Sequence, residues 1–179
     1  MMKKIVSLVL LAILTFSFVA CSQSGVEIPE GMQIVSNGDV AYNFFVPGGW
    51  VPFEKDGFFG AYYSASDRSS ITASSLYPNG EMQSINDYWA SLEASYKETF
   101  KNYTLIEAPE NDQSNVLLGD RKAYKYVFTA DIDGMSYKLM QVVTVHDNMF
   151  YNVTYTSTAE LYESHLADVE RSIAEFDFK

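Results

Sequence analysis

The chain has 179 residues, with 23 acidic and 12 basic side chains, and a formal net charge of −11 at pH 7. Nucleic-acid binding requires clustered Lys and Arg, because they must neutralise the phosphate backbone, so this charge argues against a nucleic-acid partner. Aromatic residues make up 15% of the sequence. They fit a β-rich core, in which Tyr and Phe are favoured, although exposed rings can also bind sugars or peptides.

The N-terminal segment has the features of a secretory signal peptide. Lys3 and Lys4 precede an uncharged, mostly apolar run over residues 5–20, which ends at the single cysteine, Cys21. The alternative is an uncleaved membrane anchor, but the run is shorter than the roughly 20 residues that span a bilayer. No Lys or Arg follows it directly. We therefore predict a signal peptide over residues 1–20.

The residues Phe18-Val19-Ala20-Cys21 resemble the lipobox of bacterial lipoproteins. This resemblance implies cleavage before Cys21 and lipidation of its sulfur by a diacylglycerol, with fatty-acyl chains such as palmitate. Two acyl chains hold a protein stably on a bilayer. We therefore expect a lipid-anchored protein on the extracytoplasmic face of the cell membrane, with the bilayer as its first partner.

One folded domain is expected after the leader. Removing residues 1–20 leaves 179 − 20 = 159 residues, and losing Lys3 and Lys4 changes the charge from −11 to −13. This length fits a single domain that needs no metal or disulfide to fold. Residues 22–31 contain Ser, Gly, Pro and Glu with little apolar pattern, so over residues 21–31 we predict a lipidated cysteine followed by a flexible tether. The domain is then expected over residues 32–179.

The first part of this domain is predicted to be β-rich. Turn signals such as Asn37-Gly38 and the run 47–49 separate short apolar segments, a pattern typical of strands joined by tight turns. The predicted strands cover residues 32–36, 41–46, 58–64 and 70–77.

A helix is predicted from Ser84 to Asn102. Ser84 is a suitable N-cap, and Asp87 places negative charge at the positive end of the helix dipole. The apolar residues recur at spacings of four, three, four and four, which puts them on one face. They are Ile85, Trp89, Leu92, Tyr96 and Phe100.

The strongest strand pattern follows. After a strand over residues 103–107 and a polar loop over 109–115, alternation predicts strands over 123–132, 136–145 and 150–156. Asp133-Gly134 and Asp147-Asn148 supply the turns of this antiparallel meander. Met140, Val142 and Phe150 lie out of phase with the other apolar residues, which indicates that both faces of the sheet are partly covered.

A final helix is predicted to begin at Ser157 or Thr158. Its apolar stripe recurs at spacings of four, three, four and three, through Tyr162, Leu166, Val169, Ile173 and Phe176. Strands, helix, meander and helix together predict an α+β domain with helices packed on an antiparallel sheet.

The assembled pattern resembles the PsbP-like family, over roughly residues 39–178. The residues that carry the resemblance are Gly119, Tyr137-Lys138, the strand 124–128 and two longer runs. These runs are Tyr42-x-Phe44-x-Val46-Pro47-x-x-Trp50 and Tyr151-x-Val153-Thr154-Tyr155-Thr156, followed by the closing helix with Ile173 and Phe176. The resemblance implies an α-β-α sandwich with a central antiparallel sheet, used mainly for binding or assembly. With the lipobox, it identifies a bacterial lipoprotein with a PsbP-like domain.

No catalytic or metal site emerges from the sequence, and no cofactor is expected. The two histidines, His146 and His165, are interpreted as a solvated strand end and as packing at the helix boundary. Zinc sites need three or four ligands from His, Cys or carboxylate, and none can be assembled here. Asp131-Ile132-Asp133-Gly134 resembles the start of a calcium loop but lacks its later ligands, so we interpret it as a turn.

Gly48, Gly49 and Trp50 are the candidate ligand-binding residues. Two glycines allow a ligand to approach the backbone, and the indole of Trp50 could then stack on it. In the alternative interpretation, the glycines turn the chain and Trp50 closes the end of the sheet.

Three functions remain open. The leading hypothesis is a non-enzymatic binding or assembly module for another envelope protein. The second is a receptor for a small ligand (sugar, peptide or metal ion) with an aromatic-lined pocket. The third is an enzyme with a carboxylate-based site built from distant residues. Partner identity, physiological process, oligomeric state and the number of membranes in the envelope do not follow from the sequence.

Overall fold

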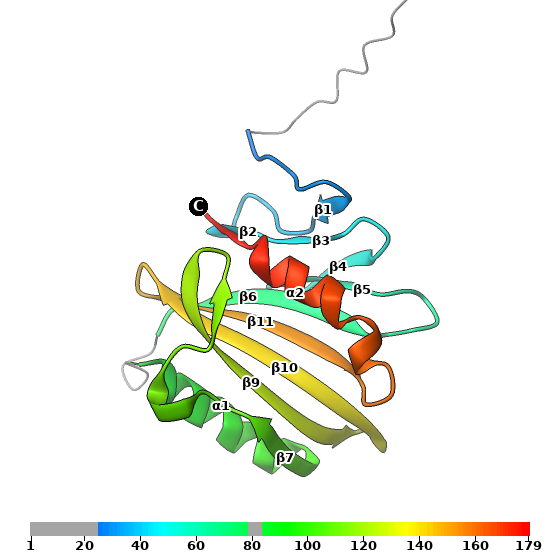
Figure 1. Ribbon diagram of the computed structural model, residues 1–179, viewed down its shortest axis with the longest axis vertical. Coiled ribbons are helices and arrows are strands. Elements are labelled where there is room, and N and C mark those ends of the chain that lie inside the picture. Colours follow the sequence, from blue (N-terminus) through cyan, green and yellow to red (C-terminus); the bar gives the residue numbers. More distant parts are fainter. Residues whose placement is uncertain (1–24, 79–83) are drawn as a thin grey trace, which may run out of the picture.

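The computed structural model describes residues 25–78 and 84–179 (Figure 1). The predicted signal peptide and Cys21 lie outside these residues. In the part that is described, no helix combines the length and the apolar character needed to cross a membrane.

Eight of the described strands form one antiparallel sheet (Figure 1). Along the sheet, seven of them follow the order β4-β5-β6-β11-β10-β9-β7, and β8 pairs with the outer edge of β9. The predicted meander is confirmed as its centre. The bounds are β4 Val51–Lys55, β5 Phe58–Tyr62, β6 Ser70–Leu76, β7 Lys101–Glu107, β8 Val116–Leu118, β9 Arg121–Ile132, β10 Met135–His146 and β11 Met149–Thr158.

The two predicted meander turns are confirmed. Asp133 and Gly134 have φ angles of 51° and 83°, and Asp147 and Asn148 have 46° and 59°. Two successive positive φ values are the signature of the tight turn that matches strand twist, and Asp, Asn and Gly adopt them at least cost.

The first helix, α1 (Ile85–Thr99), is also confirmed, although it ends three residues before the predicted Asn102. Ser84 is its N-cap, and the Ser84 hydroxyl accepts a hydrogen bond from the Asp87 backbone N–H at 3.1 Å. The chain leaves the helix at Phe100 in an extended conformation and enters β7 directly.

The two helices pack against different side chains of the central strands. Trp89 of α1 belongs to a cluster with Phe128 of β9 and Leu139 of β10. Val169 of α2 (Leu166–Ala174) belongs to the main core with Met140. Because side chains alternate between the faces of a strand, the residues next to one another in β9 and β10 meet different helices. The predicted α+β class with an antiparallel sheet is confirmed, and both faces are partly covered.

Two small sheets complete the domain. β1 (Met32–Ile34) pairs with β3 (Phe45–Pro47), and β2 (Tyr42–Asn43) pairs with β12 (Asp177–Phe178). The C-terminal strand therefore lies beside the start of the domain. Two short 3₁₀ turns, η1 (Glu110–Asp112) and η2 (Tyr162–Ser164), lie before β8 and α2.

The predicted start of the last helix is wrong. Ser157 and Thr158 continue the β-ladder opposite Lys138 and Tyr137, and α2 begins only at Leu166. The Ser157 hydroxyl, expected as a helix cap, instead lies 2.8 Å from the Ser69 hydroxyl, and both residues are buried. The backbone groups of Ser157 and Thr158 lie in the ladder with β10, so these residues continue the strand instead of starting a helix.

Three of the described strands were not predicted: β4, β8 and the two-residue β12. β4 contains Pro52, which cannot donate a ladder hydrogen bond, but β4 is an edge strand, where proline is tolerated. β8 is only three residues long and follows a polar loop, so its alternation is too short to recognise.

Candidate binding groove beside the second helix

A groove runs between α2 and the sheet. Period-two alternation places Lys125 of β9 and Met140 of β10 on the side of the sheet that faces α2. On the helix, Leu166, Glu170 and Ile173 are four and three residues apart, so they share the face that looks back at these strands.

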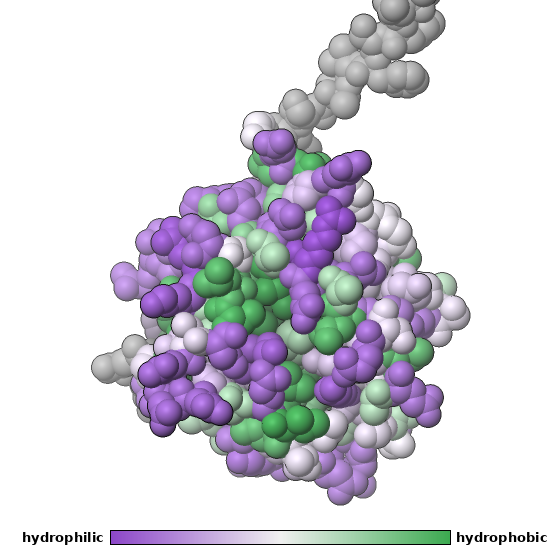
Figure 2. All heavy atoms as spheres, in the orientation of Figure 1, coloured by the Kyte–Doolittle hydropathy of each residue, from purple (hydrophilic) through white to green (hydrophobic). Residues whose placement is uncertain are grey.

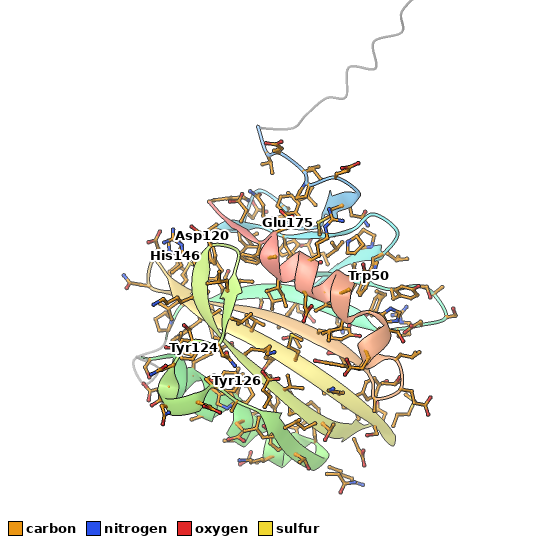
Figure 3. The ribbon with its side chains drawn as sticks, in the orientation of Figure 1. Trp50, Asp120, Tyr124, Tyr126, His146 and Glu175 are labelled. Atoms are coloured by element: carbon orange, nitrogen blue, oxygen red, sulfur yellow. The ribbon has the colours of Figure 1, made fainter. Side chains whose placement is uncertain are left out.

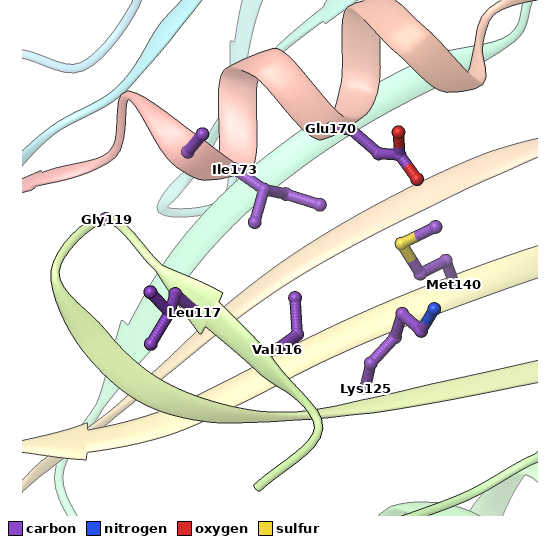
Figure 4. A pocket seen from close by; sticks show the side chains of 8 residues that line it. Val116, Leu117, Gly119, Lys125, Met140, Glu170 and Ile173 are labelled. Carbon is purple, nitrogen blue, oxygen red and sulfur yellow. The ribbon is translucent and has the colours of Figure 1, made fainter.

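Two adjoining cavities make up this groove, which we call the α2 groove. Their volumes are about 300 and 180 Å³, and they share Lys125, Met140 and Glu170 as walls. Figure 4 shows the Lys125 ammonium and the Glu170 carboxylate reaching toward the Met140 side chain from opposite sides. The remaining lining residues are Ile106, Glu107, Val116, Leu117, Gly119, Val127, Lys138, Tyr162, Glu163, Leu166, Ile173 and Ala174.

One half of the groove is apolar. Val116 and Leu117 of β8 face Ile173 of α2 across the larger cavity (Figure 4). Leu117 is 54% exposed and Ile106, in the smaller cavity, is 57% exposed. Figure 2 shows a hydrophobic patch beside α2, over β8, bordered by hydrophilic side chains. Apolar side chains that stay in water along a groove are typical of an interaction site.

The other half carries charge. Lys125 Nζ lies 2.9 Å from Glu107 Oε1, and Lys138 Nζ lies 2.8 Å from Glu163 Oε1. Lys138 Nζ also lies 4.1 Å from the centre of the Tyr162 ring, a cation–π contact. Both lysines are thus already neutralised, whereas no ion pair of Glu170 occurs among the described residues.

The β8–β9 hairpin forms one wall of the groove and is fastened at two points. At its tip, the Gly119 N–H donates to the Ile173 carbonyl at 2.9 Å. Gly119 has a φ of +55°, and a Cβ there would collide with the Phe176 carbonyl oxygen. At its base, the Asn115 amide bonds to the backbone of Lys125. The apolar wall therefore has a defined position relative to α2.

The candidate residues from the sequence lie elsewhere. Trp50 is 4% exposed, and its Nε1–H donates to Asp168 Oδ2 at 3.3 Å (Figure 3). The Gly48 N–H donates to the Gly31 carbonyl at 2.9 Å, while a Cβ on Gly49 would meet nothing within 4 Å. None of the three lines the two cavities of the α2 groove. Their role in ligand binding stays a prediction, and their contacts are those of a turn and a packed ring.

His165 joins α2 to the β5–β6 loop. Its Nε2 lies 2.7 Å from Asp67 Oδ2, and its ring stacks on Tyr63 with centroids 3.9 Å apart. Burial by itself would raise the pKa of Asp67, but hydrogen bonds from Ser69 and His165 and the attraction of the imidazole outweigh it and lower the pKa. A carboxylate only accepts, so His165 Nε2 carries the proton. The predicted boundary packing of His165 therefore includes a buried polar clasp.

The remaining polar candidates have simple surroundings. His146 Nε2 lies 3.5 Å from Asp147 Oδ2. Asp147 belongs to the β10–β11 turn, where its φ is positive. Asp131 accepts a hydrogen bond from the Asn102 amide. Within residues 25–78 and 84–179, no group of three or more His, Cys, Asp or Glu is placed to hold a metal ion.

Sequence reasoning missed the groove residues. Lys125 interrupts the aromatic and apolar run 123–128 of β9, which was the available signal that its side of the strand opens to solvent. Glu170 lies within the apolar stripe of α2, four residues after Leu166 and three before Ile173. These two charges share a cavity only because α2 packs beside the β8–β9 hairpin.

Known proteins resemble this chain in structure alone. No family model and no curated protein sequence matches it. Cyanobacterial PsbP (CyanoP) from Synechocystis matches with a TM-score of 0.60 at 12% identity, over 90% of this chain and 99% of the other. A Pseudomonas aeruginosa protein of unknown function, described as a putative regulator, matches at 0.55 and 15% identity, over 80% and 94%. The Saccharomyces cerevisiae Ran-binding protein Mog1p matches at 0.52 and 8%, over 80% and 89%.

At these identities the likeness concerns the fold. The match to cyanobacterial PsbP extends over nearly the whole of that protein, in agreement with the resemblance that the strand and helix patterns indicated. The chain has a PsbP-like fold.

Proposed function

We propose that the protein is a bacterial lipoprotein, anchored through Cys21 on the extracytoplasmic face of the cell membrane. Its PsbP-like α-β-α sandwich acts without catalysis, as a binding or assembly module for another envelope protein. The observation that carries the binding role is the α2 groove, in which exposed Leu117 and Ile106 border two adjoining cavities. The anchoring rests on the lipobox resemblance.

The groove suits protein binding better than catalysis. Four of its five charged side chains are paired with one another at 2.8–2.9 Å, whereas an acid or base in catalysis must reach a substrate proton. Its apolar half is a cavity lined by aliphatic side chains, which an apolar side chain of a partner can fill. Binding energy at protein interfaces is concentrated in a few such buried anchors.

A photocrosslinking experiment in cells tests the binding role. A photoreactive phenylalanine analogue replaces Leu117, and a matched one replaces Phe58, which is 45% exposed on β5 near the opposite edge of the sheet. We expect one discrete crosslinked species from position 117 and none of that mass from position 58. Equal crosslinking from both positions, or none from position 117, would contradict the proposal.

The anchor is tested separately. In the Cys21→Ala variant the acceptor sulfur is absent, so the protein should leave the detergent-soluble membrane fraction or remain as an unprocessed precursor. Mass spectrometry of the native protein should find a diacylglyceryl adduct on Cys21 as the first residue. An unmodified thiol at this position would refute the lipoprotein assignment but would not bear on the binding role proposed for the α2 groove.

A small-ligand receptor is the second candidate. The larger cavity, about 300 Å³, is at the lower limit of sites that enclose small molecules. Its lining is mainly aliphatic, and Tyr162 is the aromatic residue of the adjoining cavity. A sugar, peptide or metal ion that raises the thermal midpoint of the wild type but not of Met140→Ala would favour this candidate.

A further inference from the structure

The α2 groove differs in chemistry from one end to the other. The end between β8 and α2 is apolar, formed by Val116, Leu117 and Ile173. Glu170 lies between the two ends, because it borders both cavities. An occupant that fits the whole groove needs an apolar group at one end and a polar group beside it.

The charge at Glu170 indicates the sign of that polar group. The groove contains three carboxylates (Glu107, Glu163 and Glu170) and two ammonium groups. Lys125 and Lys138 are engaged by Glu107 and Glu163, which leaves the Glu170 carboxylate as the charge available to an incoming group. An acidic ligand would have to displace an ion pair and would also face Glu170. A basic ligand pairs with Glu170 directly and is attracted by the net negative charge of the chain.

The shape of the groove indicates an extended chain. The two cavities adjoin lengthwise along α2, from Leu117 to Glu163, and both are open to solvent at exposed Leu117 and Ile106. In an extended peptide, residues two apart point to the same side and lie roughly 7 Å apart. An apolar and a basic side chain at that spacing can enter the apolar end and reach Glu170 together.

Resting on the proposed function, we infer that the α2 groove binds an extended segment of the partner protein in which an apolar and a basic residue are two positions apart. The apolar side chain occupies the space between Val116, Leu117 and Ile173. The basic side chain pairs with Glu170. The ion pairs of Lys125 and Lys138 stay intact and exclude acidic segments.

Calorimetric titration of the mature lipidated protein in neutral phosphatidylcholine nanodiscs tests this inference. The probe is the blocked peptide Ser-Leu-Ser-Lys-Ser, compared with Ser-Leu-Ser-Glu-Ser and Ser-Ser-Ser-Lys-Ser. We expect the first peptide to bind more tightly than either of the others. Its affinity should fall as NaCl is raised from 50 to 300 mM, because salt screens the contact with Glu170.

Charge-matched variants locate the contact. Glu170→Gln should weaken the Leu–Lys peptide roughly fivefold, the range of a single favourable ion pair. Glu54→Gln removes the same charge from β4, at the opposite edge of the sheet from β7, and should leave the affinity within twofold. Leu117→Ala should weaken the Leu–Lys peptide but not the Ser–Lys peptide.

The outcomes separate this inference from the proposed function. The inference that the ligand is apolar and basic would be overturned if the Leu–Glu peptide bound as tightly as the Leu–Lys peptide or more tightly. It would also be overturned if Glu170→Gln and Glu54→Gln changed the affinity for the Leu–Lys peptide equally. Failure of excess Leu–Lys peptide to reduce the crosslink from position 117 would overturn it too. If a discrete crosslink still forms from position 117 and not from position 58, the proposed function stands in each of these cases. If no such crosslink forms in protein that carries only the photoreactive residue, the proposed function is refuted.

Discussion

The side-chain amide of Asn115 forms two hydrogen bonds with the backbone of Lys125. Asn115 Oδ1 accepts from the Lys125 N–H at 2.8 Å, and Asn115 Nδ2 donates to the Lys125 carbonyl at 3.2 Å. This pair lies on the outer edge of β9, between the part paired with β8 and the part paired with β7. The Asn115 amide thus takes the place of a neighbouring strand at Lys125, so the backbone N–H and carbonyl of Lys125 are not left unpaired at the edge of β9.

The variant Asn115→Ala should lower the free energy of unfolding by about 1 kcal/mol, the usual net value of hydrogen bonds at a partly solvated site. Hydrogen exchange at the Lys125 amide should become faster, because its acceptor is lost. Gln113→Ala, an exposed residue in the same loop, is the control and should change neither quantity. Unchanged exchange at Lys125 in Asn115→Ala would contradict the structural role given to this pair.

The hairpin tip allows a sharper comparison between two glycines. Gly119 and Gly134 both have positive φ, but only at Gly119 would a Cβ meet another group, the Phe176 carbonyl. Gly134→Ala should cost about 1–2 kcal/mol from backbone conformation alone. Gly119→Ala adds a backbone collision and should cost about 2–5 kcal/mol in total. Urea denaturation measures both, and equal losses would show that the tip does not depend on its close approach to Phe176.

The clasp between Asp67 and His165 predicts an acid-dependent stability. The pKa of Asp67 is lowered in the folded protein, since its hydrogen bonds with Ser69 and His165 outweigh the effect of burial. Its stabilisation is therefore complete above the ordinary Asp pKa of about 3.9 and disappears as the pH falls through the lower, folded-state pKa.

The variant Asp67→Asn should lose about 1–3 kcal/mol at pH 7, the cost of weakening a mostly buried hydrogen-bond cluster. The difference in stability from the wild type should begin to shrink below about pH 4 and should keep shrinking as the pH falls toward the lower folded-state pKa. Asp133→Asn, in the β9–β10 turn where Asn fits equally well, is the control. Denaturation curves recorded from pH 3 to pH 7 provide the test, and a difference that is constant with pH would exclude the clasp as its source.

Buried tyrosines predict a loss of stability at alkaline pH. Burial raises the pKa of Tyr96, Tyr126 and Tyr155 to about 12. The folded state favours the neutral phenol, so this stabilisation is complete below the ordinary pKa of about 10 and is lost as the pH rises toward 12. We expect loss of β-sheet circular dichroism in that interval, together with cooperative tyrosinate absorbance.

The variant Tyr126→Phe should shift this alkaline transition to higher pH, because one group that must ionise on unfolding is removed. The ring keeps its stack on Trp89, whose centroid lies 3.7 Å away. Tyr77→Phe, at a residue that is 73% exposed, should leave the midpoint unchanged. Tyrosinate absorbance that rises without any change in circular dichroism would contradict this mechanism.

The elements that could be predicted are those whose signals are local. Helix α1 needs only Ser84 as a cap and one apolar stripe, and the meander needs only alternation and two turns with positive φ. Prediction failed where a local signal for a helix competed with backbone pairing between strands. Ser157 has the chemistry of a helix cap, but the ladder with β10 engages this residue first.

The sequence alone determined the charge, the export signal pattern, the antiparallel meander and the two amphipathic helices, because each depends on residues near one another in the chain. Only the tertiary structure decided which charges share a cavity. Glu170 is distant in sequence from Lys125 and Met140, and it meets them only because α2 packs beside the β8–β9 hairpin on this face of the sheet. The tertiary structure also decided that Trp50 is packed against α2 and hydrogen-bonded to Asp168, since burial depends on what covers a side chain rather than on its neighbours in the chain.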